Sequence, residues 1–253
     1  RRLRQPPAVY DTYRRFAQRL DDVGYYRTGN ANIWTEGDGD AAERVTATWV
    51  TASMLPMLGV APLLGRPFTA DEERLAGSQA VILSESIWRT RFDARADVIG
   101  KTLMVNSVPR EIVGVMPARF AFPAADTRLW LPARPALDSV VADFAYSGVA
   151  RLAPGATAEQ AQRELAVVLP RMAESFPRLE SGGSTATWIA EHGPSPLVVP
   201  LRDEVTGGVA QVLWLLAAAA GLVLLVAWAN VANPMLIRAD TRQAELAVRA
   251  ALG

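Results

Sequence analysis

The sequence predicts an α+β domain with an inserted β-rich middle, lying outside the cytoplasm and followed by one transmembrane helix. Three observations favour this fold class. Short runs typical of strands are interspersed with helical patterns over roughly the first two hundred residues, half of the residues are hydrophobic, and residues 209–232 form an apolar stretch without a charge. A chain of 253 residues with this composition can bury a sizeable core.

The first part of the domain combines one helix with strands. Residues 7–20 predict an amphipathic helix, because apolar side chains recur at helical spacing and Pro7 falls in the first turn. Residues 23–28 and 32–35 predict a hairpin, and residues 43–50 predict a strand with alternating faces.

The middle of the chain is predicted to be rich in strands. In order, we expect a helical turn at 53–58, a loop at 59–68, a strand at 80–83, a helix at 84–92 capped by Ser84, and a hairpin of strands 102–105 and 110–115 around the turn 106–109. The last part predicts a strand at 146–152, a helix at 157–175 with a capping box of Thr157 and Gln160, and closing strands at 185–190 and 197–201.

The apolar stretch at 209–232 is long enough to cross a hydrocarbon core of about 30 Å. Trp214 and Trp228 lie toward its two ends, where indole rings favour the headgroup region. The alternative is a buried helix of a soluble protein, but such helices seldom run this long without a charge. We therefore predict a membrane helix.

The charges beside this stretch predict its orientation. Arg202 before it is offset by two carboxylates, whereas three arginines follow it: Arg238, Arg242 and Arg249. Since positive charge favours the cytoplasmic side, residues before 209 are expected outside the cytoplasm and those after 232 inside. The sequence before residue 7 has no apolar run of a signal peptide, so we expect a membrane helix upstream of Arg1 to supply export.

Composition and motifs argue against several functions. Lys+Arg and Asp+Glu are equal at 26, which does not favour a nucleic-acid partner, and without cysteine no thiol chemistry is available. Gly100-Lys101-Thr102 resembles the end of a P-loop, but Arg95 stands where the leading glycine is required, so a turn before a strand is favoured. We predict no cofactor.

Two further groups could suggest metal or catalytic chemistry. The acidic residues at 36–40 have Ala47 where a calcium loop needs a glutamate, so a polar turn is favoured. His192 is the only histidine and is expected in a surface turn. No Gly-x-Ser-x-Gly is present, and a hydrolase using dispersed carboxylates is the weaker alternative to a protein that is not an enzyme.

Several motifs, in this order, resemble the periplasmic core domain of MacB/FtsX-type ABC transporter permeases, with the orphan permeases nearest. They are Leu58-Gly59-Val60, Leu64-Gly65-Arg66-Pro67-Phe68, Val81-Ile82-Leu83-Ser84, Trp88 with Arg91-Phe92, Ile99-Gly100-Lys101-Thr102-Leu103, Asn106, and Ile112-Val113-Gly114-Val115-Met116-Pro117. The residues Asn230-Val231-Ala232-Asn233, Arg238 and 245–253 resemble the start of the FtsX-like permease domain.

This resemblance implies a division of the chain. Residues 1–206 would be the periplasmic core domain, with a sabre-like insertion at 53–137 between porter-like flanks at 1–52 and 138–206. Residues 207–233 would be the second membrane helix of a four-helix permease, and 234–253 the cytoplasmic start of the FtsX-like domain. The implied location is the bacterial inner membrane.

The resemblance also implies partners: a separate cytoplasmic ABC ATPase, a second permease copy, the lipid bilayer and a periplasmic adaptor. Residues 238–252 predict an amphipathic helix, on which Arg242, Glu245 and Arg249 are the candidate ATPase contacts. The alternative for Glu245 and Arg249, four residues apart, is a solvated pair within the helix. Pro234 departs from the family pattern and should kink or end the membrane helix.

These observations leave two functions of different kinds. The first is a permease subunit that couples ATP hydrolysis by the separate ATPase to movement of the periplasmic domain. The alternative is a membrane-tethered domain that binds a ligand or partner without transport.

Overall fold

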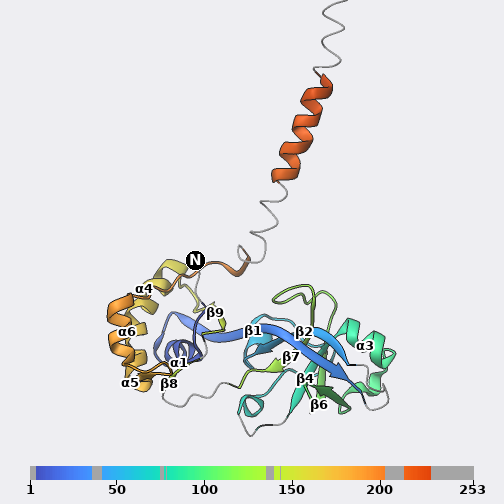
Figure 1. Cartoon of the computed structure of the whole chain (residues 1–253), viewed down its shortest axis with the longest axis horizontal. Helices are drawn as coiled ribbons and strands as arrows, with labels where there is room; N and C mark the ends of the chain where they lie inside the picture. Colours follow the sequence, from blue (N-terminus) through green and yellow to red (C-terminus); the bar gives the residue numbers. More distant parts are fainter. Residues whose placement is uncertain are drawn as a thin grey trace, which may run out of the picture. The chain divides into compact units, whose positions relative to one another are not determined.

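The structure is a computed structural model that describes residues 4–35, 42–74, 77, 79–134, 140–142, 144–202 and 214–228 (Figure 1). It divides into two compact units, Arg1–Val199 and Pro200–Gly253. The first unit contains the sheets and the hydrophobic cores described below, and it combines helices with strands. The predicted α+β class is confirmed.

The elements of the first unit follow one another in a mixed order. The helices, including short 3₁₀ turns, are α1 (Pro7–Phe16), α2 (Met54–Met57), η1 (Ala70–Glu73), α3 (Glu85–Phe92), η2 (Ala96–Val98), α4 (Ala158–Val168), η3 (Leu169–Arg171), α5 (Met172–Ser175) and α6 (Thr185–His192). The strands are β1 (Leu20–Trp34), β2 (Glu43–Val50), β3 (Leu64–Gly65), β4 (Ala80–Ser84), β5 (Thr102–Val105), β6 (Val108–Met116), β7 (Thr127–Pro132), β8 (Val140–Val141), β9 (Ser147–Leu152) and β10 (Arg178–Leu179).

The main sheet closes on itself. Its pairings run from β2 through β7, β4, β6 and β5 to β1, and β1 pairs again with β2, so these strands form a ring. The pairs β2–β7 and β4–β6 are parallel, and the other pairs of the ring are antiparallel. Strand β9 extends the sheet from β1, β3 adds to β6, and β8 pairs with β10 apart from the ring.

The interior of the ring holds one hydrophobic core, which we call the barrel core. It is filled by inward-facing side chains of the strands, with Ile87 of α3 and Val98 of η2. As in other small closed sheets, side chains occupy the interior. Its members are Ala31, Ile33, Val45, Ala47, Val81, Leu83, Ile87, Val98, Leu103, Val105, Ile112, Val115, Leu129 and Leu131.

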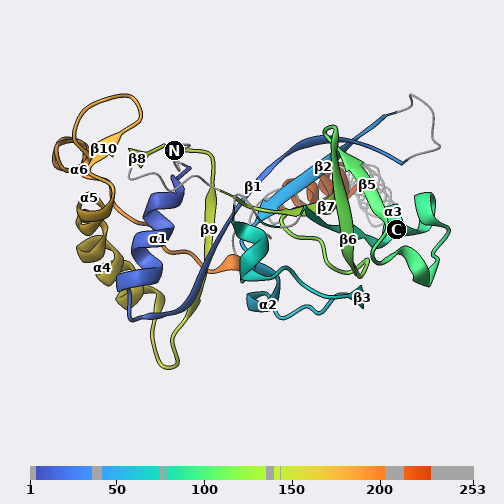
Figure 2. The ribbon, with the colours of Figure 1, turned by 90° about the horizontal axis from the view of Figure 1, so that it is seen from below.

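A second core, the helical core, combines residues from the N-terminal and C-terminal parts of the first unit. It packs α1 against α4, η3 and α5, together with residues of β1 and β8. Its members are Ala8, Val9, Tyr10, Tyr13, Val23, Val141, Tyr146, Leu165, Val168, Leu169, Met172 and Phe176. Figure 2 shows β1 extending from the side of α1 toward β2 and β5.

The hairpin predicted within residues 23–35 is wrong, because residues 23–34 belong to the continuous strand β1. Gly29 lies between the two predicted strands, and its missing side chain makes room for a ring: a Cβ there would lie 3.2 Å from Cζ3 of Trp49. Gly24 likewise lets the Thr51 hydroxyl approach, 2.6 Å from where a Cβ would stand. The real hairpin is β1 with β2.

The two predicted closing strands are also wrong. Residues 185–192 form helix α6, and residues 193–200 are without strand or helix. The less exposed positions of α6 are Thr185, Trp188 and Ile189, which is helical rather than alternating spacing. Residues rich in β-branched and aromatic side chains thus became a helix because tertiary packing overrode their strand propensity.

The other predicted elements are largely confirmed. The helix expected at 7–20 ends at Phe16, since Leu20 begins β1. The helix expected at 157–175 has its capping box of Thr157 and Gln160, but it breaks into α4, η3 and α5 near Pro170. The Ser84 cap is present, with Ile87 N donating to Ser84 Oγ over 3.4 Å.

The second unit contains a helical segment at residues 214–228, whose leucine, valine and tryptophan side chains are exposed. Among the residues that the structure describes, no helix combines the length and hydropathy needed to cross a membrane. The predicted membrane helix at 207–233 extends on both sides beyond this segment, outside the described residues.

The β5–β6 turn provides a test of local structure. Asn106 and Ser107 have φ values of 50° and 64°, and Asn106 Oδ1 accepts a hydrogen bond from Asn32 N over 2.8 Å. Asn106→Ala should lower the free energy of unfolding by about 1–2 kcal/mol, because the hydrogen bond to β1 is lost and alanine disfavours positive φ. Urea denaturation measures this loss.

Ser107→Gly is the matched control. Glycine suits positive φ at the second position of a tight turn, so this variant should be at least as stable as the parent chain. Equal stability of Asn106→Ala and the parent would contradict the assigned role of Asn106.

Candidate mechanical junction

Strand β1 passes from one hydrophobic core to the other. Val23 lies in the helical core, whereas Ala31 and Ile33 lie in the barrel core. The partners change along the strand: residues 20–26 pair with β9, and residues 26–33 pair with β2. Tyr26 is the crossover, because it pairs with both Val50 and Ser147. We call the region around Tyr26 the junction.

An arginine lies beside this crossover. The Arg27 guanidinium carbon is 4.7 Å from the centre of the Trp49 ring and 5.8 Å from that of Tyr146. Trp49 packs against the barrel core, and Tyr146 is a member of the helical core. Cations at such distances are attracted to the electron-rich ring faces. The two cores therefore share one cation.

Tyrosines fill the helical side of the junction. The Tyr10 and Tyr25 rings stack with centres 5.3 Å apart, and Tyr25 meets Tyr146 edge-on at 5.1 Å. A side chain at position 148 would collide with the Tyr10 ring, so Gly148 permits this packing. Burial raises the pKa of Tyr10 and of Tyr25 above the ordinary value, so both phenols stay protonated.

A loop of residues 66–74 and Gly77, which we call the strap, is fastened by the buried carboxylate of Glu72. Arg66 donates to it through Nη1 at 3.2 Å and Nη2 at 2.9 Å, and Thr69 N donates at 2.8 Å. Arg134, just after β7, donates to the carbonyls of Glu72 and Gly77 over 2.8 and 3.2 Å. The bonds from Arg66 and Thr69 compensate the Glu72 carboxylate, which would be costly to bury alone.

The next residue, Glu73, ties the strap to the junction. Its carboxylate accepts a hydrogen bond from Ala52 N. The neighbouring Thr51 is bound to β1, since Thr51 N donates to Tyr25 O over 3.1 Å and Tyr25 N donates to Thr51 Oγ1 over 3.3 Å. Adjacent glutamates thus have different roles: one fixes the strap internally and the other fixes it beside β1.

Burial raises the pKa of the Glu73 carboxyl above its usual range, and the charge of Asp22 acts in the same direction. The hydrogen bond from Ala52 N and the charge of Arg14 oppose this shift without cancelling it. The charged form of Glu73 is therefore disfavoured in the folded state compared with an exposed glutamate.

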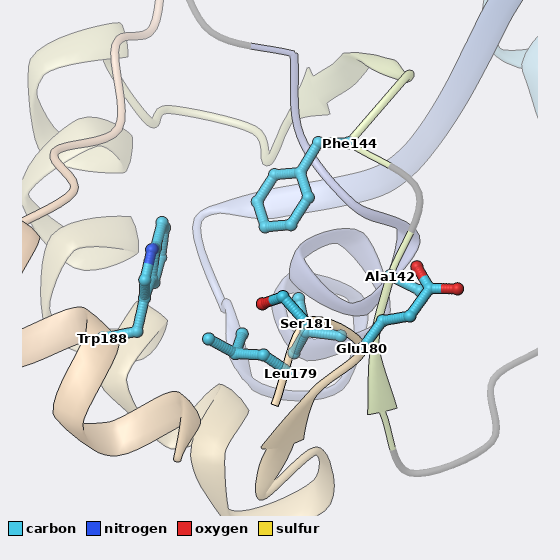
Figure 3. A pocket seen from close by; sticks show the side chains of 7 residues that line it. Ala142, Phe144, Leu179, Glu180, Ser181 and Trp188 are labelled. Carbon is cyan, nitrogen blue, oxygen red and sulfur yellow. The ribbon is translucent and has the colours of Figure 1, made fainter. Parts of the chain in front are cut away.

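A small pocket lies on the helical side, between β8, β10 and α6 (Figure 3). It has a volume of about 180 Å³ and is lined by Val141, Ala142, Phe144, Leu179, Glu180, Ser181 and Trp188. The centres of the Phe144 and Trp188 rings are 5.9 Å apart, and Trp188 stacks on His192 with ring centres 5.4 Å apart. The lining suits a small apolar group, and among the lining residues that the structure describes Glu180 is the one carboxylate.

The structure places two of the motifs considered in the sequence. His192 ends α6 rather than lying in a turn, and its Nδ1 is 3.1 Å from Trp188 O. Gly100, with φ of 85°, precedes β5, as expected for a turn before a strand, and Lys101 is ion-paired with Asp97 at 3.1 Å.

The remaining candidates fall outside the described residues. They are the acidic turn at 36–40, the helix-break candidate Pro234, and the ATPase-contact candidates Arg242, Glu245 and Arg249. Sequence reasoning missed Arg27 and Glu73. The partners of Arg27 come from β2 and from the residue before β9, so no local pattern marks the contact.

Comparison with known proteins identifies the family. The model of the MacB-like periplasmic core domain matches residues 4–168. The chain belongs to this family. The predicted resemblance to MacB/FtsX-type ABC transporter permeases is therefore confirmed. The match covers the barrel core and the strand that joins it to the helical core.

Solved structures agree with this MacB-like fold. The periplasmic region of MacB from Actinobacillus actinomycetemcomitans has a TM-score of 0.54 and 16% identity, covering 68% of this chain and 76% of that one. A domain of a putative permease protein from Porphyromonas gingivalis has a TM-score of 0.52 and 19% identity, covering 68% and 72%. At such identities the likeness concerns the fold alone. No curated protein matches the chain.

The raised pKa of Glu73 predicts a pH effect in this MacB-like domain. A group whose pKa is raised on folding stabilises the folded state at low pH, and this contribution is lost as the pH rises through the folded pKa. Glu73→Gln keeps an acceptor for Ala52 N but cannot ionise. Relative to the parent chain, its free energy of unfolding should increase from pH 4.5 to pH 7.5, measured by urea denaturation.

Glu180→Gln, at an exposed carboxylate, is the control and should stay within about 0.5 kcal/mol of the parent throughout. A stability difference between Glu73→Gln and the parent that is constant with pH would show that Glu73 does not titrate as described.

Proposed function

We propose that this chain is part of the permease subunit of an ABC-type export or mechanotransmission system. A separate cytoplasmic ATPase would hydrolyse ATP, and the MacB-like domain would move in response. The observation that supports this most is the shared strand β1, whose two halves lie in different cores. Because rigid secondary elements and packed side chains carry coupling between distant sites, displacement of one core would displace the other.

We propose the bacterial inner membrane as the location, with residues 1–206 outside the cytoplasm and 234–253 inside. The uncharged stretch at 209–232 and the arginines that follow it support this topology. Pro234 would kink or end the helix near the cytoplasmic surface.

Within the exterior domain we propose a sabre-like unit at 53–137 and a porter-like unit formed by 1–52 and 138–206. The barrel core contains mostly residues of the sabre-like part, and the helical core contains only residues of the porter-like part. Four residues of the N-terminal flank also enter the barrel core: Ala31, Ile33, Val45 and Ala47. In space, therefore, the sabre-like and porter-like parts would share β1 and β2.

The proposed partners are the ATPase, a second permease copy and a periplasmic adaptor. For the ATPase we propose contacts through Arg242, Glu245 and Arg249, on the amphipathic segment that follows the membrane helix. The pattern of opposite charges on a predicted amphipathic helix suits a specific protein interface.

One observation favours the alternative, a membrane-tethered binding domain that transports nothing. The pocket beside Phe144 and Trp188 could hold a small apolar group of a ligand or partner. The two functions differ in the ATPase: a tethered binding domain would be displayed on the cell surface at full level without binding one.

Topology can be tested by cysteine labelling, because the chain has no cysteine of its own. In intact cells, a membrane-impermeant maleimide should label Asp38→Cys and should label Arg242→Cys only after the membrane is opened. Mass spectrometry of the purified protein measures the labelled fraction. Labelling of Arg242→Cys from outside would overturn the proposed orientation.

The ATPase contact can be tested by exchanging two charges in the full-length permease. The double variant Glu245→Arg/Arg249→Glu keeps opposite charges four residues apart but reverses those offered to a partner. If the residues contact the ATPase, co-purification should fall roughly tenfold or more.

If these residues only form a solvated pair within the helix, the exchange leaves ATPase recovery unchanged. Arg163→Glu, on α4 of the exterior domain, is the control and should not alter recovery. Loss of recovery in this control would point to a general folding defect.

A further inference from the structure

We infer that Arg27 is a positioning residue that makes the barrel core and the helical core move as one body. The inference deepens the proposed function, since it rests on that function for its biological purpose. The physical claim, that one guanidinium couples two cores, stands on contacts within the described domain.

The contact on the barrel side is fixed by strand register. Arg27 lies directly opposite Trp49 in the β1–β2 pair, and the guanidinium carbon lies 4.7 Å from the centre of the indole ring. Gly29, on the same face of the sheet, leaves room for the ring, because the indole comes within 3.2 Å of where a Cβ would stand. Trp49 itself packs against the barrel core.

The contact on the helical side ends in a different set of elements. Tyr146, 5.8 Å from the same guanidinium carbon, is 4% exposed and belongs to the helical core. Its backbone forms a two-way bridge with Gln5, in which the N–H···O distances are 2.9 and 3.2 Å. Gln5 lies just before α1, so Tyr146 is bound to the start of that helix and to the start of β9.

The energetic basis is the incomplete hydration of the guanidinium. Arg27 Nε is buried and has no hydrogen-bond partner among the residues that the structure describes. A buried polar group without a partner is costly, and the attraction of a partly desolvated cation to two ring faces offsets part of this cost. Arginine suits this place because its planar group stacks on rings and stays charged.

The arrangement resists relative movement of the cores. If the barrel core turned about the crossover at Tyr26 without the helical core, Arg27 would keep Trp49, its partner in the strand pair, and lose Tyr146. The cation would then stay partly buried with one ring instead of two. Joint movement preserves both contacts, so the lower-energy displacement is one in which the cores move together.

The test is native-state hydrogen exchange of the 253-residue chain in detergent micelles, with increasing low concentrations of urea. Amides of β4 and β6 report opening of the barrel core, and amides of α4 report opening of the helical core. In the parent chain both groups should open together, with one free energy and one urea dependence. Opening in two separate steps in the parent would overturn the inference.

Arg27→Met removes the charge and keeps a long side chain. It should separate the two openings, and the less stable core should open about threefold to thirtyfold more often than the other. If both cores instead became less stable by the same factor, Arg27 would be merely structural. Arg44→Met, on an exposed arginine of β2, is the matched control and should open as the parent does.

Arg27→Lys keeps the cation and should restore joint opening, so identical behaviour of the Lys and Met variants would refute the electrostatic basis. If Arg27→Met fails to fold, Tyr146→Leu replaces it: loss of one ring should also separate the openings, and joint opening would overturn the proposal. No ATPase is present in this experiment. Its failure therefore leaves the proposed permease function standing, and failure of that function leaves this coupling standing.

Discussion

The backbone hydrogen bonds of β1 go to different partners at its two ends, and both cores depend on this division. Near Leu20 the strand is paired with β9, and near Ile33 it is paired with β2 and β5. Each pairing fixes which side chains face which core, because a shift by one residue would turn every side chain to the opposite face. One strand therefore sets the registers of a helix-covered layer and of a closed sheet together.

The strap adds a second link to this region and shows how neighbouring side chains of one type acquire different properties. Glu72 is buried but meets Arg66 and the Thr69 N–H, so its charge is compensated. Glu73 faces the turn after β2, where Ala52 N is its hydrogen-bond partner and the charge of Asp22 is nearby. Glu72 stabilises the strap through its ion pair with Arg66, whereas Glu73 has a raised pKa.

The sequence predicted those parts of the structure in which local chemistry decides the outcome. The capping box of Thr157 and Gln160, the Ser84 cap and the β5–β6 hairpin all follow from residues close together in the chain. It failed where distant packing decides: Gly29 lies inside a strand because it accommodates Trp49, and α6 replaces a strand because three residues at helical spacing turn inward. The Arg27 contact could not be predicted, since its two rings lie nearly one hundred residues apart.

The closed ring of β1, β2, β7, β4, β6 and β5 has a consequence for recognition. Within the ring each strand has neighbours on both edges, although several of the ladders are short. An exposed strand edge invites another chain to add a strand, and closure removes that opportunity. A protein that binds around the barrel would thus have to recognise side chains and surface shape, so its specificity could change by surface substitution while the backbone scaffold stays the same.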